Sequence, residues 1–497
     1  MVKANKILDK IHAPGWVVLI LAIIFLFRIP TFLEPYHYGD EMIYLNLGEA
    51  ARRGMVLYRD IHDNKPPLLY LIAGLAGNLF LFRAILAGWM MATTILFWRL
   101  AEALFPKNSL IVKVSTVAFA LLTTLPLLEG RIPNAELFML APTMAAFLIL
   151  LTQKLSAKNL FIAGIFFSIS TLFKVPAVFD MGAIVFLWLV AIKLRGKNIA
   201  KVAVQTAILF AGFAIPILLT IIWYWLQGAL TQYLTAAFLQ NVGYLSSWRP
   251  SDVSEPFLTR NGPLLMRTGV LLSGLLLLYL FRNKLTKKFI FIVGWLLFSL
   301  FAATLSERPY PHYLVQLVPT VSLLVGMLAA ARSIEQSLAV LPMFLVLIAV
   351  VRYQFWYYPS LPYYQRFVAF VSGQISKEEY FTSFDKNAAR NYKIAEFLVT
   401  SSEKTDPVFV WGDSATIYAL SKRLPPVRYV ADYHIIDFSS QEEIVTQLHS
   451  TKPKFVVVLP DSRPFPLLSG FLQDGYLLIQ NIDGVLVWKS TNLPIKR

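Results

Sequence analysis

The stretch GWVVLILAIIFLF (residues 15–27) decides the fold class, because it places thirteen uncharged, mostly apolar residues directly after a basic segment. Lys3, Lys6 and Lys10 precede it. This arrangement is similar to a signal peptide, but no small-residue cleavage site follows it and many more apolar runs do. We therefore predict an uncleaved first membrane span with its N-terminus in the cytoplasm.

The rest of the chain also has the composition of a membrane protein. Of its 497 residues, 57% are hydrophobic and 15% are charged, whereas a soluble domain carries about 25% charged residues. The formal net charge is +16, but the basic residues form short clusters between apolar runs, as the positive-inside rule requires. This pattern argues against a nucleic-acid partner. The absence of cysteine excludes thiol nucleophiles and thiolate metal sites, and it leaves the compartment open.

The apolar runs predict a polytopic α-helical membrane protein with about 11 to 13 spans, since one span needs roughly 20 residues. The eleven full spans that we predict are 15–33, 84–104, 110–128, 137–153, 159–174, 176–193, 202–226, 263–281, 289–305, 313–331 and 337–357. A twelfth stretch, 66–82, is shorter and contains glycine breaks. We interpret it as a re-entrant or juxtamembrane helix.

The charge pattern predicts which side each loop occupies. The clusters QKLSAKN (153–159), KLRGKNIAK (193–201) and RNKLTKK (282–288) are expected in the cytoplasm. Counting spans from them places the C-terminus outside. Four polar segments then share the outer face, namely 34–66, 129–136, 227–262 and 306–313. The expected location is the plasma (inner) membrane.

The last part of the chain has a different pattern. Residues 1–357 are predicted to form the membrane module, and residues 358–497 an extracytoplasmic α/β domain. Short strands are predicted at DPVFVWGD (406–413), PPVRYV (425–430), KFVVVLP (454–460) and GYLLIQN (475–481), and helices at 386–402 and 440–451. Alternating strands and helices are typical of a small α/β domain. We expect it to be a structural or acceptor-facing cap.

The first outer loop is rich in functional groups. DEMIYLNLGEAARRG (40–54) predicts a short amphipathic helix with Asp40 and Glu41 in its first turn and Gly54 at its end. Acids in a first turn stabilise the helix dipole, so helix capping is one interpretation of the pair. In DNKPP (63–67), two prolines hold Lys65 extended. A fixed cation at the membrane surface suits a phosphate, and the alternative is a snorkelling lysine.

The stretch YGDEMIYLNLGEAARRGMVLYRDIHDNKPPLLYLI (38–72) resembles the first loop of the GT-C-type membrane glycosyltransferases. It is most similar to the branch that includes the protein O-mannosyltransferases and the bacterial lipid A aminoarabinose transferase. In that branch an Asp-Glu pair follows the first span, and a Lys-Pro-Pro-Leu or His-Pro-Pro-Leu run follows later. Here these features are residues 40–41 and 65–68.

Two further landmarks of this family have counterparts in the chain, and the resemblance covers roughly residues 15–330. EGRIPNAELFML (129–140) offers Glu136 as the acid of the second outer loop, where the family more often has Asp, with Arg131 and Glu129 nearby. ERPYPHYLVQLVP (307–319) fits the basic and aromatic cluster that opens a late span. The charge pattern alone already places all three motifs on the outer face.

The resemblance implies a GT-C-type fold and an inverting glycosyltransferase. Such an enzyme transfers a sugar from a polyprenyl-phosphate donor to a glycan, lipid or protein hydroxyl. Asp40 is then the expected base, and Glu41 or Glu136 orients hydroxyl groups. The expected ligands of the donor phosphate are Lys65, Arg308, Tyr310, His312 and Tyr313. The expected substrate-orienting residues are Glu129, Arg131, His62 and Asp63.

Several alternatives remain open. His37, Asp40, Glu41, His62 and Asp63 supply enough ligand atoms for a divalent metal, but their spacing matches no compact ligand motif. Some relatives use such a metal and others do not, so no cofactor is assigned.

Other functions predict other sequence features. A transporter or flippase of lipid-linked precursors would be expected to carry charged residues in mid-span. A non-catalytic family member would be expected to lose the Asp-Glu pair. Lys174, at the end of an apolar run, is predicted to be a snorkelling lysine.

Overall fold

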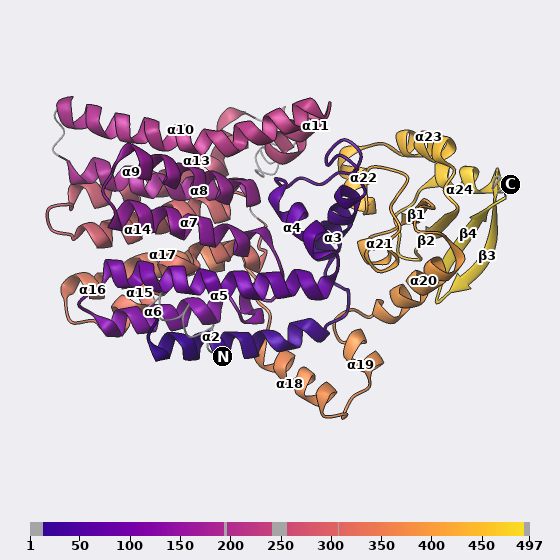
Figure 1. Cartoon of the computed structure of the whole chain (residues 1–497), viewed down its shortest axis with the longest axis horizontal. Coiled ribbons are helices and arrows are strands. Elements are labelled where there is room, and N and C mark those ends of the chain that lie inside the picture. The colour runs from indigo at the N-terminus through magenta and orange to yellow at the C-terminus, as the bar shows by residue number, and fades with distance from the viewer. Residues whose placement is uncertain (1–12, 193–195, 241–255, 307, 492–497) are drawn as a thin grey trace. The chain divides into compact units, whose positions relative to one another are not determined.

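The computed structural model describes residues 13–192, 196–240, 256–306 and 308–491 (Figure 1). Its contacts divide the chain into two compact units. Unit 1 comprises residues 1–31, 83–222 and 239–361, and unit 2 comprises residues 32–82, 223–238 and 362–497. The division therefore differs from a single cut near residue 357, because the first loop groups with the C-terminal domain.

Unit 1 consists of helices. They are α2 (Gly15–Arg28), η1 (Ile29–Leu33), α5 (Leu79–Leu104), α6 (Ser109–Leu122), η2 (Pro126–Leu128), α7 (Ala135–Thr152), α8 (Ala157–Phe173), η3 (Val175–Phe179), α9 (Asp180–Ala191), α10 (Gly196–Leu226), α13 (Phe257–Leu280), α14 (Lys287–Thr304), η7 (Pro311–Leu317), α15 (Val318–Ala329), α16 (Ile334–Leu338) and α17 (Val340–Arg352). The long apolar helices run side by side in Figure 1.

The apolar helices make the chain an integral membrane protein. Within the described residues, eight helical segments are long and apolar enough to cross a membrane, and three shorter apolar ones cover 109–122, 157–173 and 175–191. These eleven segments coincide in position with the predicted spans. That all eleven cross the membrane stays a prediction.

Burial separates inner from outer helices in unit 1. In the apolar windows of α7 and α14, 72% and 78% of the residues are buried, against 17% in α10 and α13. A helix that is apolar all round and exposed in the protein is suited to contact lipid. Polar side chains on α7 and η7 therefore lie in the interior of unit 1.

Unit 2 contains the remaining elements. They are α3 (Gly39–Arg52), α4 (Leu68–Ala76), α11 (Leu230–Leu234), a π-helix (Thr235–Leu239), α18 (Ser360–Val371), α19 (Lys377–Thr382), α20 (Ala388–Ser401), β1 (Val408–Trp411), α21 (Ala415–Ser421), α22 (Asp432–Phe438), α23 (Gln441–Thr451), β2 (Phe455–Val458), α24 (Pro466–Gln473), β3 (Tyr476–Ile482) and β4 (Val485–Ser490). The predicted helix over residues 40–54 is confirmed as α3.

Helices α3 and α4 cross at two glycines. A Cβ atom on Gly48 would lie 2.3 Å from the backbone nitrogen of Gly74, so the two backbones touch where any other residue would hold them apart. At nine residues, α4 is roughly 14 Å long, which is too short for a complete span. The crossing fixes the two ends of the first loop against each other.

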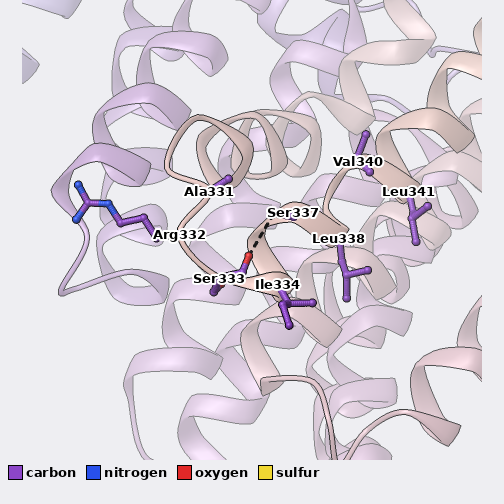
Figure 2. Close-up of a pocket in the computed structure, with 8 residues that line it drawn as sticks. All are labelled: Ala331, Arg332, Ser333, Ile334, Ser337, Leu338, Val340 and Leu341. Atoms are coloured by element: carbon purple, nitrogen blue, oxygen red, sulfur yellow. Dashed lines mark hydrogen bonds between the residues drawn. The ribbon is translucent and has the colours of Figure 1, made fainter.

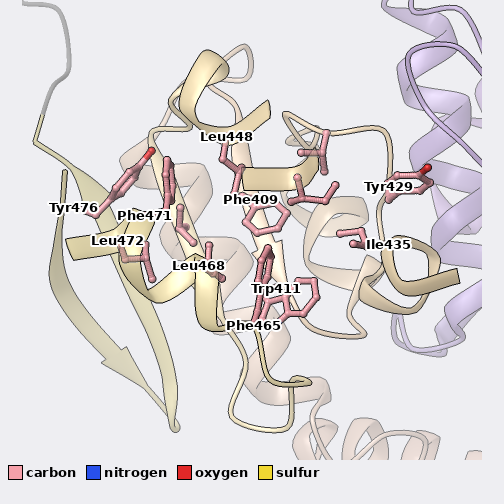
Figure 3. Close-up of a cluster of buried hydrophobic side chains, with 13 residues drawn as sticks. Phe409, Trp411, Tyr429, Ile435, Leu448, Phe465, Leu468, Phe471, Leu472 and Tyr476 are labelled. Carbon is pink, nitrogen blue, oxygen red and sulfur yellow. The ribbon is translucent and has the colours of Figure 1, made fainter. Parts of the chain in front are cut away.

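The C-terminal sheet has the strand order β1-β2-β4-β3, with β1 parallel to β2 and the other pairs antiparallel. Its core contains Phe409, Trp411 and Phe471 (Figure 3). Strand β4 was not predicted. The sequence feature that indicates β4 is the Asp483-Gly484 pair. It has positive φ at both residues and forms the two-residue turn typical of a β-hairpin.

The predicted strand PPVRYV (425–430) is wrong, since the structure has no strand there. Val427 and Tyr429 are buried in the core of the domain, which explains the apolar pattern. The backbone carbonyl of Arg428 accepts a hydrogen bond from the backbone N–H of His62 at 2.8 Å. The segment therefore binds the first loop of unit 2 rather than a neighbouring strand.

Candidate active site

Asp40 and Lys65 lie next to each other in unit 2. The Tyr44 hydroxyl, one helical turn after Asp40 on α3, donates to Asp40 Oδ2 at 2.8 Å. The Lys65 ammonium lies 3.6 Å from the same oxygen and 4.9 Å from the centre of the Tyr44 ring. The first turn of α3 thus aims a carboxylate at a fixed cation.

The backbone of Lys65 is held on both sides by tyrosines. Its N–H donates to the Tyr70 hydroxyl at 3.0 Å, and its carbonyl accepts from the Tyr58 hydroxyl at 2.8 Å. Tyr58 itself has a left-handed backbone, with φ of 71°, which is uncommon outside glycine. The backbone of Lys65 is therefore positioned by these two tyrosines.

The adjacent acids of the Asp-Glu pair have different environments. The Asp40 side chain is 33% exposed, whereas Glu41 is completely buried. Asp40 is thus accessible to solvent, whereas Glu41 is not. The pair therefore has one accessible member.

His62 and Asp63 lie in the interior of unit 2. Asp63 Oδ2 accepts from the Tyr70 hydroxyl at 2.7 Å and lies 4.0 Å from the Lys65 ammonium. His62 is 3% exposed, and burial lowers the pKa of its imidazole to about 4, so the ring is neutral at pH 7. His62 packs against Tyr429 and Phe438 of the C-terminal domain.

A second cluster of charged groups lies inside unit 1. His312 on η7 faces two carboxylates, with Nδ1 2.5 Å from Glu129 Oε2 and Nε2 3.6 Å from Glu136 Oε1. Glu136, in the first turn of α7, also accepts a hydrogen bond from the Lys174 ammonium. That ammonium lies 3.7 Å from the centre of the Tyr313 ring. The cluster is therefore a chain of alternating acids and bases.

The segments around this cluster add aromatic and constrained groups. Tyr310 stacks on His312 at 5.5 Å between ring centres. Glu129 has a left-handed backbone, with φ of 57°, and such strain is concentrated at functional sites. Arg131 is 8% exposed, whereas Arg308 is exposed. The structure thus groups Glu129, Glu136, His312 and the two tyrosines as candidates of one cluster.

Three solved structures are similar to parts or all of this chain, and the two of ArnT have TM-scores above 0.5. The archaeal oligosaccharyltransferase AglB from Archaeoglobus fulgidus, in complex with an inhibitory peptide and a dolichol-phosphate, has a TM-score of 0.45 at 12% identity, over 89% of this chain and 69% of AglB. The aminoarabinose transferase ArnT from Cupriavidus metallidurans has a TM-score of 0.53 in the apo state, at 11% identity, over 95% of this chain and 97% of ArnT. Bound to undecaprenyl phosphate, ArnT again has 0.53, at 13% identity, over 98% of this chain and all of ArnT.

The chain has the GT-C fold. In addition, residues 388–483 match the family described as "Putative competence-induced protein Ccs4 C-terminal domain". That match covers helix α20 to strand β3 of the C-terminal domain. No curated protein matches the sequence.

On this GT-C fold, the structure corrects the prediction made for Lys174. It was predicted to snorkel, but it pairs with Glu136 in the interior of unit 1. The predicted topology contained a signal, because it placed the end of α8 and the start of α7 on the same side of the membrane. His434 of α22 was also missed, and its Nε2 lies 3.8 Å from Asp63 Oδ1.

The described residues contain no cluster of side chains arranged as a metal site. No group of three or more His, Asp or Glu side chains there is placed to hold a metal ion. Asp40 and Asp63 instead lie within 4.0 Å of the Lys65 ammonium, which supplies the positive charge of this site.

A pocket of about 460 Å³ is lined by residues between Ala331 and Leu341 around α16 (Figure 2). None of the candidate residues lines it. Ser337 there donates to the Ser333 carbonyl. The pocket therefore does not belong to either charged cluster.

Proposed function

We propose that this GT-C protein is an inverting glycosyltransferase that transfers a sugar from a polyprenyl-phosphate donor to an acceptor hydroxyl on the outer face of the membrane. The observation that carries the proposal is the accessible Asp40 carboxylate beside the Lys65 ammonium. Two tyrosines hold the backbone of this lysine in place. A carboxylate base and a fixed cation are the two groups that such a transfer requires.

The proposed reaction is a single displacement. The acceptor oxygen attacks the anomeric carbon, and its proton passes to Asp40. The bond between that carbon and the phosphate oxygen breaks, and the lipid phosphate leaves with the electron pair. Lys65 stabilises the negative charge that develops on this phosphate. The reaction inverts the anomeric carbon and needs no covalent intermediate with the protein.

The unit 1 cluster has a proposed role in the same reaction. His312, Tyr310 and Tyr313 supply hydrogen-bond donors for the donor phosphate or sugar, while Glu129 and Glu136 orient hydroxyl groups. The similar ArnT structure holds undecaprenyl phosphate, which supports a lipid phosphate as the donor class. A glycan, lipid or protein hydroxyl fits the acceptor role.

The position of the charged groups favours an enzyme over a transporter. Transporter sites are built near the middle of the membrane from interrupted helices. Here Glu136 lies in the first turn of α7 and Lys174 directly follows α8. The acid pair of α3 is also retained, which disfavours a non-catalytic role.

Lys65→Ala is expected to raise the KM for the donor by roughly 10- to 100-fold, because a hydrogen bond to a charged group contributes about 1.5–3 kcal/mol. The assay measures transfer of radiolabelled sugar from a polyprenyl-phosphate donor in membranes. Arg59→Ala is the matched control, since Arg59 is an exposed cation of the same loop that pairs with Asp60. An unchanged donor KM in Lys65→Ala would contradict the phosphate role.

The proposed orientation in the inner membrane has its own test. Reporter tags at positions 108, 198 and 285 are expected to be cytoplasmic, and a tag after position 497 extracytoplasmic, because the basic clusters stay inside. Accessibility of the tags to an impermeant reagent in intact cells measures this. A cytoplasmic C-terminus would reverse the assigned face of the site and of the C-terminal domain.

A further inference from the structure

His434 belongs to the C-terminal α/β domain but contacts the first loop within unit 2. It lies on α22 and is 5% exposed. Its Nε2 atom lies 3.8 Å from Oδ1 of Asp63. His434 is thus buried against Asp63, although the two residues are far apart in the sequence.

Asp63 connects this histidine to the proposed catalytic groups. Its Oδ1 accepts from the backbone N–H of Asn64 at 2.8 Å, and its Oδ2 accepts from the Tyr70 hydroxyl at 2.7 Å. The same Oδ2 lies 4.0 Å from the Lys65 ammonium, which in turn lies 3.6 Å from Asp40. The Lys65 ammonium therefore lies between two acids, and Asp63 is the one that contacts His434.

Two hydrogen bonds also connect the first loop to the segment before α22. The His62 N–H donates to the Arg428 carbonyl at 2.8 Å, and the Arg428 guanidinium donates to the Tyr58 carbonyl at 2.7 Å. Residue 428 precedes α22 by only a few residues. The loop just before Asp63 is consequently joined to the segment before α22 by one main-chain bond and one bond from the Arg428 side chain.

Burial holds the pKa of the His434 imidazole below its ordinary value. Burial lowers the pKa of the His434 imidazole, opposed by the negative charges of Asp63, Asp40 and Asp437, while the positive charge of Lys65 lowers it further. Two other ionisable rings lie nearby, Tyr433 at 4.4 Å and His62 at 6.3 Å between ring centres. Within the described residues, His434 Nδ1 is buried without a hydrogen-bond partner. Such a group costs about 1–3 kcal/mol, which points to a role other than stability.

We propose that His434 is a positioning residue for the transfer reaction, acting through Asp63 on Lys65. With Nε2 protonated, the ring points its N–H at Asp63 Oδ1 from 3.8 Å, and this polar contact adds to the hydrogen bonds from Asn64 and Tyr70 that turn Oδ2 toward Lys65. The C-terminal domain thereby completes the donor-binding side of the first-loop site. This inference rests on the proposed function for its kinetic consequence, but not for its structural one.

The kinetic experiment compares His434→Ala, His434→Gln and His449→Ala in the full-length protein. His434→Ala should raise the KM for the donor by about 10-fold, since small misplacements of a positioned group are costly, with the KM for the acceptor unchanged. His434→Gln should restore most of this loss, because its amide replaces Nε2–H. His449 is the matched control, an exposed histidine of the same domain, and its replacement should have no effect.

A double-mutant cycle tests the path through Asp63. If His434 acts through Asp63, the His434→Ala effect on the donor KM should disappear in an Asp63→Asn background. Equal effects in the two backgrounds would overturn the proposal, as would a normal donor KM in His434→Ala.

A second measurement separates this inference from the proposed function. Acylation of Lys65 by an amine-reactive reagent in nanodiscs is followed by mass spectrometry, without any sugar donor. His434→Ala should accelerate the labelling of Lys65 severalfold, because the ammonium loses its ordered partner, and His434→Gln should not. Should the wild-type protein transfer no sugar, the proposed function fails while this result still decides the positioning role. Equal labelling rates in the wild-type and Ala variants would overturn it.

Discussion

Asp40→Asn should reduce the kcat of sugar transfer by roughly 10³-fold, within the range of about 10²–10⁴ that a positioned general base contributes. The asparagine oxygen still accepts the hydrogen bond that Tyr44 donates to residue 40, so the start of α3 is expected to keep its geometry. What disappears is the group that takes the proton of the attacking hydroxyl. The measurement is single-turnover transfer of radiolabelled sugar, at matched amounts of folded protein in the membrane.

The control for this result is Asp60→Asn. Asp60 is a carboxylate of the same loop, paired with Arg59 at 2.7 Å and outside the Asp40–Lys65 contact. Its neutral variant should transfer sugar at close to the wild-type rate. Near-wild-type activity in Asp40→Asn would exclude Asp40 as the base and would leave the helix-dipole role as the explanation of the acid in the first turn of α3.

The second large effect is expected at the buried pair of Glu136 and Lys174. The Glu136 side chain is 3% exposed and the Lys174 side chain 18% exposed, so the removal of either charge leaves its partner buried. Glu136→Gln or Lys174→Met should each destabilise the folded protein by about 3–5 kcal/mol. The double variant should lose much less than the sum, because neither charge is then left unpaired. Reversible unfolding in detergent or nanodiscs measures the four states of the cycle.

The exposed pair of Lys393 and Asp483 provides the comparison. Their side chains are 57% and 48% exposed and lie 2.9 Å apart. Exposed ion pairs contribute little to stability, so neutralising either partner should leave the unfolding transition almost unchanged. Additive losses for Glu136 and Lys174 would show that the two groups do not support each other.

Elements with a strong local pattern were predictable from the sequence. The apolar runs coincide with the eleven apolar helical segments, and the polar periodicity of residues 40–54 corresponds to α3. Both features depend on residues that are close together in the sequence, because these determine the length of an apolar run and the amphipathicity of a helix. The hairpin of β3 and β4 carried a local turn signal as well. Residues 425–430 show the opposite case, since burial in the domain core produces an apolar pattern without a strand.

Contacts between distant residues were not predictable in the same way. Lys174 pairs with Glu136, which is 38 residues away in the sequence. His434 lies beside Asp63, which is several hundred residues away in the sequence. Both depend on how helices and loops pack, and no period of the sequence encodes that packing. The first-loop site could be placed from its motif, whereas the partners that fix its charges required the fold.

The assembly of unit 2 has a consequence for how the protein is made. The Tyr363 hydroxyl donates to Glu34 at 2.5 Å, and the Asn46 amide on α3 donates to the Ala415 carbonyl at 2.9 Å. Because chains are synthesised from the N-terminus, the first loop leaves the ribosome long before these partners exist. A nascent chain therefore carries the acid pair and the lysine before the C-terminal groups that contact the first loop exist. The first loop therefore reaches its full set of contacts only at the end of translation, so a chain truncated before residue 363 would keep the sequence motif and lack these contacts.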